Sequence, residues 1–523
     1  MTSSLSRSSI QAFLDRYHLS IIILLTITVS IVGFIYFYQL DLITAYGDSR
    51  AHLNIARRAV DGLTPGLAQL GGAWLPLLHA LMLPTVWHDF MWQSGISGSL
   101  VNMLAYIVSM IVLYKLVYEI TKNKLNAFLG YLIVALNINI IYFQATPMTE
   151  MLFISTLIIA IYLLVRWRTT ESVLYLIGSG FFFFLSSFNR YEGWAVVPVA
   201  MILVGLISLI KNGKSQAEAN VIMFGTVAGL GIALWILWQL VIFGDPLDFL
   251  KNDFAAGVNT ARDVQAGQVP TYDNLLLSFL TEIYASFHTS GIVITVLGFL
   301  AIAIFIFLSN KKIFHSKKVL ILLGMIPFLF EVLVVYKGIV PVHVLEIPID
   351  GNRNSFNVRY ALYFLPAIAV FIATVSKKTL VVLLLLIIAV VNNVLLAGGG
   401  KVMSAIQENG IIKPIDWQKF EAISRAYDKQ GYLLASSSGT DATLFELRIP
   451  MKKLIYEGSG KYWKESLENP QRYATWILIN RSERDLLYKK LNMEKVNSHF
   501  ELKEEVRGFK LYKIKHAPTI GIT

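Results

Sequence analysis

The sequence predicts a polytopic α-helical membrane protein with about 11 transmembrane helices and a small C-terminal α/β domain. Of its 523 residues, 55% are hydrophobic and only 15% are charged, whereas a soluble domain averages about 25% charged residues. Long apolar runs recur along most of the chain, and a tail of soluble composition follows them. These three observations predict the fold class.

Composition also restricts the function. Cysteine is absent, which excludes disulfides, thiol catalysis and cysteine-ligated metal. The formal net charge is +11, but most of the excess lies in short loops between apolar runs, as is typical of membrane proteins. Because no RNA- or DNA-binding motif is visible, we expect a lipid bilayer and no nucleic acid among the partners.

The apolar runs define a membrane module over residues 1–398. The first run follows Arg7 and Arg16, is too long for a signal-peptide core and lacks a small-residue cleavage site, which predicts a retained helix. The predicted spans are 19–40, 98–118, 127–145, 150–165, 172–188, 194–210, 221–243, 288–309, 319–336, 359–376 and 379–397.

Lysine and arginine predict the orientation. One alternating set of loops is basic and, apart from Glu119 and Glu171 at helix ends, lacks acids: 115–124, 166–168, 211–214, 311–318 and 376–378. The positive-inside rule assigns this set of loops and the N-terminus to the cytoplasmic side of the membrane. We expect this membrane to be the cell (plasma) membrane.

The other loops are then external. They comprise residues 41–97, 146–150, 189–194, 244–287 and 337–358, and the region after 398. Residues 399–523 contain strand-like runs (YLLAS, KLIYEG, ATWILIN, GFKLYKI) between helix-like polar segments, which predicts an extracytoplasmic α/β domain. The sequence AGGGKV at 397–402 is the predicted hinge.

The stretch YGDSRAHLNIARR at 46–58 opens the first external loop. On a helix, Asp48 and His52 share one face, while Arg50 and Arg57 lie on roughly the opposite face. Asp48 could simply complement the helix N-terminus. The arginines would suit an anionic headgroup or phosphate, or would dock the C-terminal domain.

The next run, residues 63–84, is apolar but interrupted by Pro65, Gly71, Gly72, Pro76 and Pro84. These residues make a single spanning helix unfavourable. We therefore expect a re-entrant or interfacial segment, buried in protein or lining a wet cavity.

Two short external turns carry further candidates. In TPMTE, Thr146 is a candidate cap and Glu150 falls in the first turn of a helix, at the level of the pocket. In NRYEGW, Arg190 and Glu192 flank Tyr191, either as a mutual ion pair or as part of a cluster suited to a sugar or phosphate.

The last polar loop carries arginines on the predicted external side, where the positive-inside rule makes cations uncommon. Arg353 and Arg359, the latter followed by Tyr360, stand before the tenth span, and guanidinium groups match phosphate. The connector 244–274 is long enough to be a lid, and its Asp245 and Asp253 are weaker candidates for metal or substrate.

These residues suit transfer of a sugar from a lipid-linked phosphate. Asp48 would act as general base toward an acceptor hydroxyl, and Arg353 and Arg359 would stabilise the departing phosphate. Direct displacement would invert the sugar configuration. Because nucleotide-sugars are generally unavailable outside the cytoplasm, a membrane-bound carrier is the expected donor.

The patterns GDSRAHLNIARR, GLAQLGGAWLPLLHALMLP, TPMTE, NRYEGW and NVRYALYFLP resemble the GT-C membrane glycosyltransferases, close to protein O-mannosyltransferases and aminoarabinose lipid A transferases. The resemblance covers roughly residues 20–375. It implies that Asp48 is the catalytic base and that Glu150 lines the same pocket. It also implies that Arg353 or Arg359 binds the phosphate of a polyprenyl-phosphate sugar. The acceptor would be a glycan, lipid or protein.

Two departures from the family pattern matter. The frequent paired acids of the first loop are reduced to Asp48, flanked by Gly47 and Ser49, and no WWDxG motif occurs, which argues against an oligosaccharyltransferase. A metal site in the first loop is therefore disfavoured. A magnesium, manganese or calcium site shared between Asp48 and Glu150 or Glu192 stays an alternative.

Three other functions compete with a transferase. A flippase or transporter for a lipid-linked sugar would also use external arginines, although it would be expected to show repeat-related halves and charges within spans. An O-antigen-type ligase or polymerase shares the donor type, and a non-catalytic scaffold is the third alternative.

Overall fold

The predicted spans are helical in the computed structural model, which describes residues 2–308, 314, 316–348, 355–398, 414–482, 484–516 and 518. Seven helical segments within these residues are long and apolar enough to cross a membrane. They are α1 (Thr2–Gln39), α5 (Ile96–Thr121), α8 (Glu150–Thr170), α10 (Glu192–Asn212), η3 (Lys317–Met325) with α17 (Ile326–Tyr336), η4 (Val358–Phe364) with α18 (Leu365–Val375), and α19 (Thr379–Gly398). The chain is thus a multi-pass membrane protein.

The other four predicted spans are bent or shorter. The pair α6 (Lys124–Ala135) and α7 (Ile138–Gln144) bends by 66°, and the pair α11 (Lys214–Ala228) and α12 (Leu230–Phe243) by 44°. Between α6 and α7 the Asn137 side chain accepts hydrogen bonds from Asn139 N and Ile140 N, so it caps a new helix in a new direction. The shorter helices are α9 (Val173–Ser187) and α16 (Ile292–Leu308).

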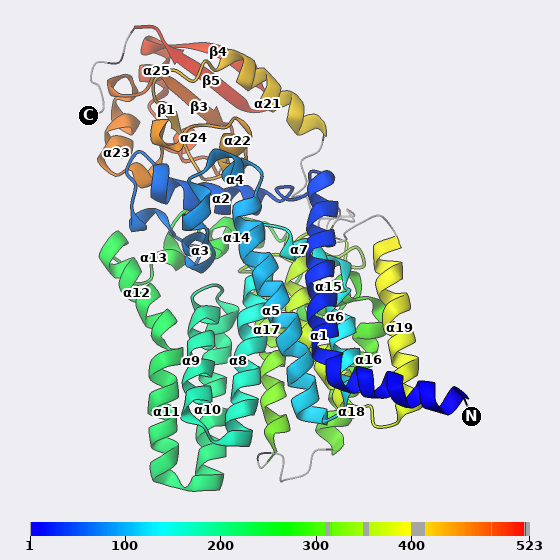
Figure 1. The fold of residues 1–523 in the computed structure, drawn as a ribbon. Coiled ribbons are helices and arrows are strands. Elements are labelled where there is room, and N and C mark those ends of the chain that lie inside the picture. Colours follow the sequence, from blue (N-terminus) through cyan, green and yellow to red (C-terminus); the bar gives the residue numbers. More distant parts are fainter. Residues whose placement is uncertain are drawn as a thin grey trace.

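The described residues of the predicted basic loops lie together at one end of the bundle. Glu119, at the end of α5, accepts hydrogen bonds from Lys122 (2.6 Å) and Lys317 (2.5 Å), and Glu171 pairs with Lys211. The turn between α10 and α11 lies at the bottom of Figure 1, whereas the C-terminal sheet lies at the top. The loop sets predicted to face opposite sides are therefore separated in space, and the orientation itself stays a prediction.

The segment 41–97 covers the end of the bundle beneath the sheet (Figure 1). It contains α2 (Gly47–Asp61), η1 (Leu67–Gln69), α3 (Leu77–Val86) and α4 (Asp89–Gln93). As predicted, residues 63–84 form no spanning helix. Pro84, however, lies inside α3 and does not end it.

The connector 244–287 is more helical than predicted. It contains α13 (Asp248–Lys251), α14 (Ala256–Gln265) and α15 (Leu275–Ser290). The last of these buries Ser278, Thr281, Glu282 and Ser286 within the bundle. Because several of its buried residues are polar, α15 has no long apolar run and was not predicted as a helix.

The C-terminal region forms a five-stranded sheet of order β2-β1-β3-β5-β4. Strands β2 (Leu454–Ile455), β1 (Leu433–Ala435) and β3 (Trp476–Asn480) are parallel, while β5 (Phe509–Ile514) and β4 (Phe500–Val506) run antiparallel to their neighbours. The helices are α21 (Pro414–Ala426), α22 (Asp441–Glu446), α23 (Lys461–Glu468), α24 (Leu486–Lys490) and α25 (Met493–His499).

The four strand-like runs correspond to β1, β2, β3 and β5. Strand β4 was not predicted, because its sequence FELKEEV is largely charged and exposed, as suits a protected sheet edge. The predicted boundary at residues 398 and 399 falls where the described chain stops, and most of the predicted hinge 397–402 lies outside the described residues.

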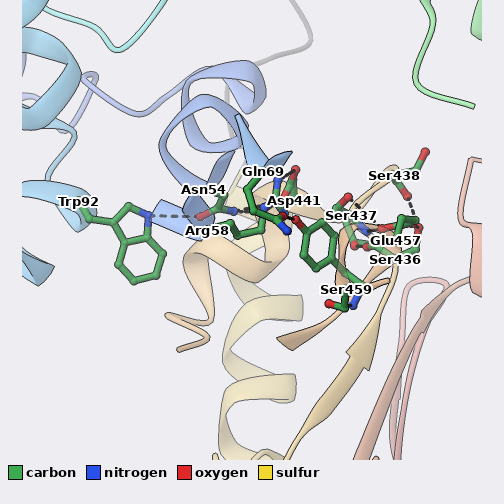
Figure 2. Close-up of polar contacts among 12 residues, drawn as sticks. Asn54, Arg58, Gln69, Trp92, Ser436, Ser437, Ser438, Asp441, Glu457 and Ser459 are labelled. Carbon is green, nitrogen blue, oxygen red and sulfur yellow. Dashed lines mark hydrogen bonds and ion pairs between the residues drawn. The ribbon is translucent and has the colours of Figure 1, made fainter. Parts of the chain in front are cut away.

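Ion pairs join this region to one face of α2, and Figure 2 shows one of them, between Arg58 and Asp441. Arg58 Nη1 lies 3.0 Å from Asp441 Oδ1, and its guanidinium lies 4.5 Å from the centre of the Tyr456 ring. Arg50 Nε lies 2.8 Å from Glu446 Oε1. The helix that carries Asp48 and His52 is therefore held from behind by the C-terminal region.

We expect Arg58→Ala to loosen this interface. Removing the cation leaves Asp441, whose side chain is only 16% exposed, without its partner; breaking a buried pair typically costs about 3–5 kcal/mol. Thermal unfolding and limited proteolysis after residue 398 would measure the loss. The matched control is Arg425→Ala, whose ion pair with Glu421 is largely exposed and is worth about 1 kcal/mol or less. Equal effects of the two substitutions would contradict the expectation.

Candidate functional site

A cavity of about 640 Å³ opens where the loops predicted to be external meet the helix bundle. This volume lies in the range of small-ligand sites, about 300–1,000 Å³. The cavity is lined by residues from distant parts of the chain. Eight of the predicted site residues contribute to its wall: Asp48, His52, Glu150, Arg190, Tyr191, Glu192, Arg359 and Tyr360.

Three of its carboxyl groups stand at helix N-termini. Asp48 is in the first turn of α2, Glu150 is the first residue of α8, and Glu192 is the first residue of α10. The exposed N–H groups and the helix dipole favour negative charge at these positions. The predicted cap at Thr146 was wrong: its hydroxyl donates to Phe143 O, and α8 begins four residues later, at Glu150.

Local packing positions Glu150. The Asn102 amide donates to two carbonyl oxygens of the turn before α8, at 2.6 and 2.7 Å. A Cβ on Gly98 would stand 2.3 Å from Pro147 Cβ, so only glycine lets this turn lie against α5. The chain therefore holds the start of α8 rigidly at the cavity wall.

Arg359 joins two of the carboxylates. Its Nη2 lies 2.7 Å from Asp48 Oδ2 and its Nε lies 3.0 Å from Glu150 Oε1. The guanidinium also lies 5.1 Å from the Tyr46 ring centre and 5.0 Å from that of Tyr360. The residue is 5% exposed, so these contacts act where water screens them little.

Arg190 forms a second cationic centre beside it. It donates to Glu192 Oε1 and to Thr149 Oγ1, each at 2.7 Å, and its Nη1 lies 3.7 Å from Glu150 Oε1. The predicted Arg190–Glu192 pair therefore forms and also belongs to the cavity. Glu150 Oε2 is buried and accepts no hydrogen bond from the described residues.

Two histidines form a buried pair at the cavity, where His52 belongs to the wall and His79 lies behind it. His52 Nδ1 lies 2.8 Å from His79 Nε2, and His79 Nδ1 lies 2.7 Å from Leu70 O. Burial lowers the pKa of His79 to about 4. Burial, reinforced by His79, Arg190 and Arg359, lowers the pKa of His52 well below its usual value. Both rings are therefore neutral at pH 7.

These lowered pKa values predict acid sensitivity of the fold. Between about pH 6.5 and 4 the unfolded chain binds a proton at residue 79 that the folded chain does not, so stability falls as the pH falls, by about 3 kcal/mol. Unfolding midpoints of wild type and His79→Gln at pH 7.5 and 5 would measure the difference. Asp485, whose pKa is raised by burial to about 6, acts in the opposite sense in both proteins. An identical pH slope in the two proteins would contradict the prediction.

One side of the cavity is apolar. Tyr191 stacks on Phe249 of α13 with ring centres 5.5 Å apart and donates to Ala73 O at 2.7 Å. The remaining apolar wall comes mostly from the predicted lid segment and from α17: Leu247, Leu250, Phe254, Phe330, Val334 and Ile339. The lid segment thus forms a wall of the cavity, whereas its Asp245 pairs with Lys251 and its Asp253 with Lys490.

Two predicted ligand-binding arginines lie elsewhere. Arg50 pairs with Glu446 of the C-terminal region. Arg57 donates to Asp61, Asp89 and the carbonyl oxygens of Val86 and Trp87. The arginine face of α2 therefore joins protein segments and does not line the cavity, and Arg353 lies outside the described residues.

The structure adds residues that the sequence search missed. Glu331, in the apolar helix α17, lines the cavity together with Glu192. Glu282 is 0% exposed, and neither of its carboxyl oxygens has a hydrogen-bond partner among the described residues. Glu331 is a lone acid within an apolar span, and because such residues are usually functional, the sequence did carry this signal.

The described residues include no group of three or more His, Asp or Glu side chains placed to hold a metal ion. Asp48 and Glu150 instead share Arg359. The cavity carboxylates are thus compensated by guanidinium groups.

Comparison with known proteins bears on the fold. Residues 76–238, from the start of α3 into α12, match the family model of dolichyl-phosphate-mannose-protein mannosyltransferase. The archaeal oligosaccharyltransferase AglB from Archaeoglobus fulgidus, solved with an inhibitory peptide and a dolichol-phosphate, superposes with a TM-score of 0.54. The alignment covers 89% of this chain and 69% of AglB, at 10% sequence identity. The chain has the GT-C fold.

ArnT from Cupriavidus metallidurans bound to undecaprenyl phosphate also matches, with a TM-score of 0.41, 10% identity and coverage of 94% of this chain and 97% of ArnT. No curated protein matches the chain. The resemblance to GT-C membrane glycosyltransferases predicted from the sequence is confirmed, and the chain combines the membrane module with a small C-terminal region that contains strands.

Proposed function

We propose that this GT-C protein is an inverting glycosyltransferase. It moves a single sugar, a hexose or pentose, from a polyprenyl-phosphate donor to an acceptor at the external face of the membrane. The observation that carries the proposal is one cavity in which Asp48 meets the guanidinium of Arg359 at 2.7 Å, beside an apolar wall. A base, a cation for phosphate and a surface for a lipid are the parts that this transfer requires.

In the proposed reaction, Asp48, Arg359 and Arg190 have different roles. Asp48 takes the proton of the acceptor hydroxyl as that oxygen attacks the anomeric carbon. The bond from this carbon to the phosphate oxygen breaks on the opposite side, which inverts the configuration. Arg359 stabilises the charge that develops on the departing phosphate, and Arg190 adds a second positive charge near it.

Arg359 also couples donor binding to the base. Its guanidinium bonds Asp48 and Glu150. A phosphate arriving at the same guanidinium takes over one of these bonds, because an arginine fork binds phosphate as it binds carboxylate. Asp48 is then released to accept the proton of the hydroxyl.

The apolar wall suits the first isoprene units of the donor lipid. Leu247, Leu250 and Phe254 are large apolar side chains that are 39–58% exposed and line the cavity on the lid segment. Burying such surface stabilises a complex by about 25 cal/mol per Å². The lipid would thereby reach the phosphate site from the side of the membrane.

The test is transfer by purified protein in liposomes that contain one polyprenyl-phosphate sugar at a time. Labelled sugar should move to an added glycan, lipid or peptide acceptor, and the product should have the opposite anomeric configuration to the donor. A product that retains the configuration would contradict the mechanism. Absence of transfer with every donor would contradict the function.

One observation favours a second candidate, a flippase for a lipid-linked sugar. Glu331 lies inside a span and lines the cavity, and carboxyl groups within spans are common in transporters. The same liposomes distinguish the two functions, because translocation of the donor lipid without any transfer supports the flippase.

A further inference from the structure

A chain of hydrogen bonds determines which nitrogen of His52 carries a proton. The chain runs from Leu70 O to His79 and from His79 to Nδ1 of His52, with distances of 2.7 and 2.8 Å. A carbonyl oxygen only accepts hydrogen bonds. The Nδ1 atom of His79 is therefore the protonated nitrogen of that ring.

The protonated nitrogen of His52 follows because both imidazole rings are neutral. Burial keeps the pKa of His79 near 4, so its Nε2 is an unprotonated acceptor at pH 7. His52 Nδ1 must then donate to it. Because burial and the neighbouring cations also keep His52 neutral, its Nε2 atom carries a lone pair and no proton.

This Nε2 atom is the ring nitrogen of His52 that is available to a ligand. It has no hydrogen-bond partner among the described residues, while the residue lines the cavity and is 4% exposed. The ring packs against Trp74 with centres 4.5 Å apart, which limits its rotation. Asp48 lies one helical turn earlier on the same face of α2.

We propose that His52 is a substrate-binding residue whose Nε2 accepts a hydrogen bond from a hydroxyl group next to the reacting centre. The hydroxyl belongs either to the donor sugar or to the acceptor. Its identity rests on the proposed function, whereas the tautomer rests on the hydrogen-bond chain and on the neutrality of the two buried rings.

His52 binds a hydroxyl and does not act as a second base. The charged and titratable groups that face it are Asp48 on α2, His79 on α3, Arg190 before α10 and Arg359 on η4. Burial and the cations among these groups lower the pKa of the ring, which makes protonation unfavourable. Accepting a hydrogen bond requires no change of charge.

The first experiment is nitrogen NMR of the full-length protein labelled at histidine. The signals of residue 52 are identified by their loss in His52→Asn. We expect one protonated and one unprotonated nitrogen at pH 7.5, unchanged at pH 5.5. Adding the donor lipid or the acceptor should shift the unprotonated signal, and the compound that does so supplies the hydroxyl. A protonated Nε2, or no shift with either compound, would overturn the inference whatever the transfer assay shows.

The second experiment is a substitution with a matched control. In His52→Asn the short amide can still donate to His79 but has no atom at the position of Nε2. We expect kcat/KM to fall by about 5- to 30-fold, as one lost hydrogen bond predicts. The exposed His88, which makes no side-chain cap at α4, supplies the control His88→Asn, which should change nothing.

Deoxygenated substrates identify the partner. An analogue that lacks the bound hydroxyl should react equally well with wild type and His52→Asn, whereas other analogues should keep the difference. Equal sensitivity of every analogue would overturn the inference. If wild type transfers the sugar but no analogue removes the difference between wild type and His52→Asn, the inference about His52 fails and the proposed function stands. If wild type transfers no sugar, the proposed function fails.

Discussion

Asp48→Asn is expected to reduce sugar transfer by about 10²–10⁴-fold, the usual contribution of a positioned general base. Asparagine has nearly the same shape, and its side-chain oxygen can still accept the Arg359 Nη2–H that now lies 2.7 Å from Asp48 Oδ2. The change therefore removes the basic oxygen and preserves the packing. Single-turnover transfer from a bound donor would measure the chemical step.

The matched control for this substitution is Asp41→Asn. Asp41 is exposed, belongs to the same loop, 41–97, and has a positive φ of 55°, a conformation that asparagine also tolerates. Transfer by this variant should equal that of wild type. Asp48→Asn that retains donor binding but transfers at the wild-type rate would exclude Asp48 as the base.

Arg359→Gln is expected to impair both folding and transfer. The substitution leaves Glu150, 1% exposed, and Asp48 without their shared cation, and breaking a buried ion pair costs about 3–5 kcal/mol. It also removes the guanidinium that is proposed to bind the donor phosphate. Unfolding midpoints and transfer rates measured on the same preparation would report the two losses.

A double variant separates the two roles of Arg359. Adding Glu150→Gln removes the uncompensated buried charge, so most of the stability lost in Arg359→Gln should return. Transfer should not return, because the phosphate still lacks its cation. Arg262→Gln, an exposed arginine on the lid segment, is the control for loss of one positive charge. Recovery of transfer in the double variant would restrict Arg359 to a structural role.

Much of the fold could be predicted because the bilayer imposes simple constraints. A span needs about 20 apolar residues, and basic loops concentrate on one side, so hydropathy and lysine and arginine positions predict both the helices and the grouping of the loops. The helix α15 was missed because its buried residues include Thr281 and Glu282, which do not form an apolar run. Strand β4 was missed because most of its residues are charged and exposed.

The grouping of the loops also predicted much of the cavity. Asp48, Glu150, Arg190 and Arg359 were selected as ionisable residues in loops that share one side of the membrane, and all four line one cavity. Sidedness limits such residues to a thin layer, where few of them can be far from the others.

The sequence by itself determined the membrane class, the succession of helices and the set of ionisable residues on each side. Only the tertiary structure decided which of these residues meet. Arg58 reaches Asp441 across 383 positions of sequence, and Arg359 reaches Asp48 across 311. Two arginines in similar loops thus serve different purposes, one in docking the C-terminal region and one in the cavity. The physical reason is that periodicity and charge report the face and side of each segment, whereas distances between segments depend on how all the helices pack.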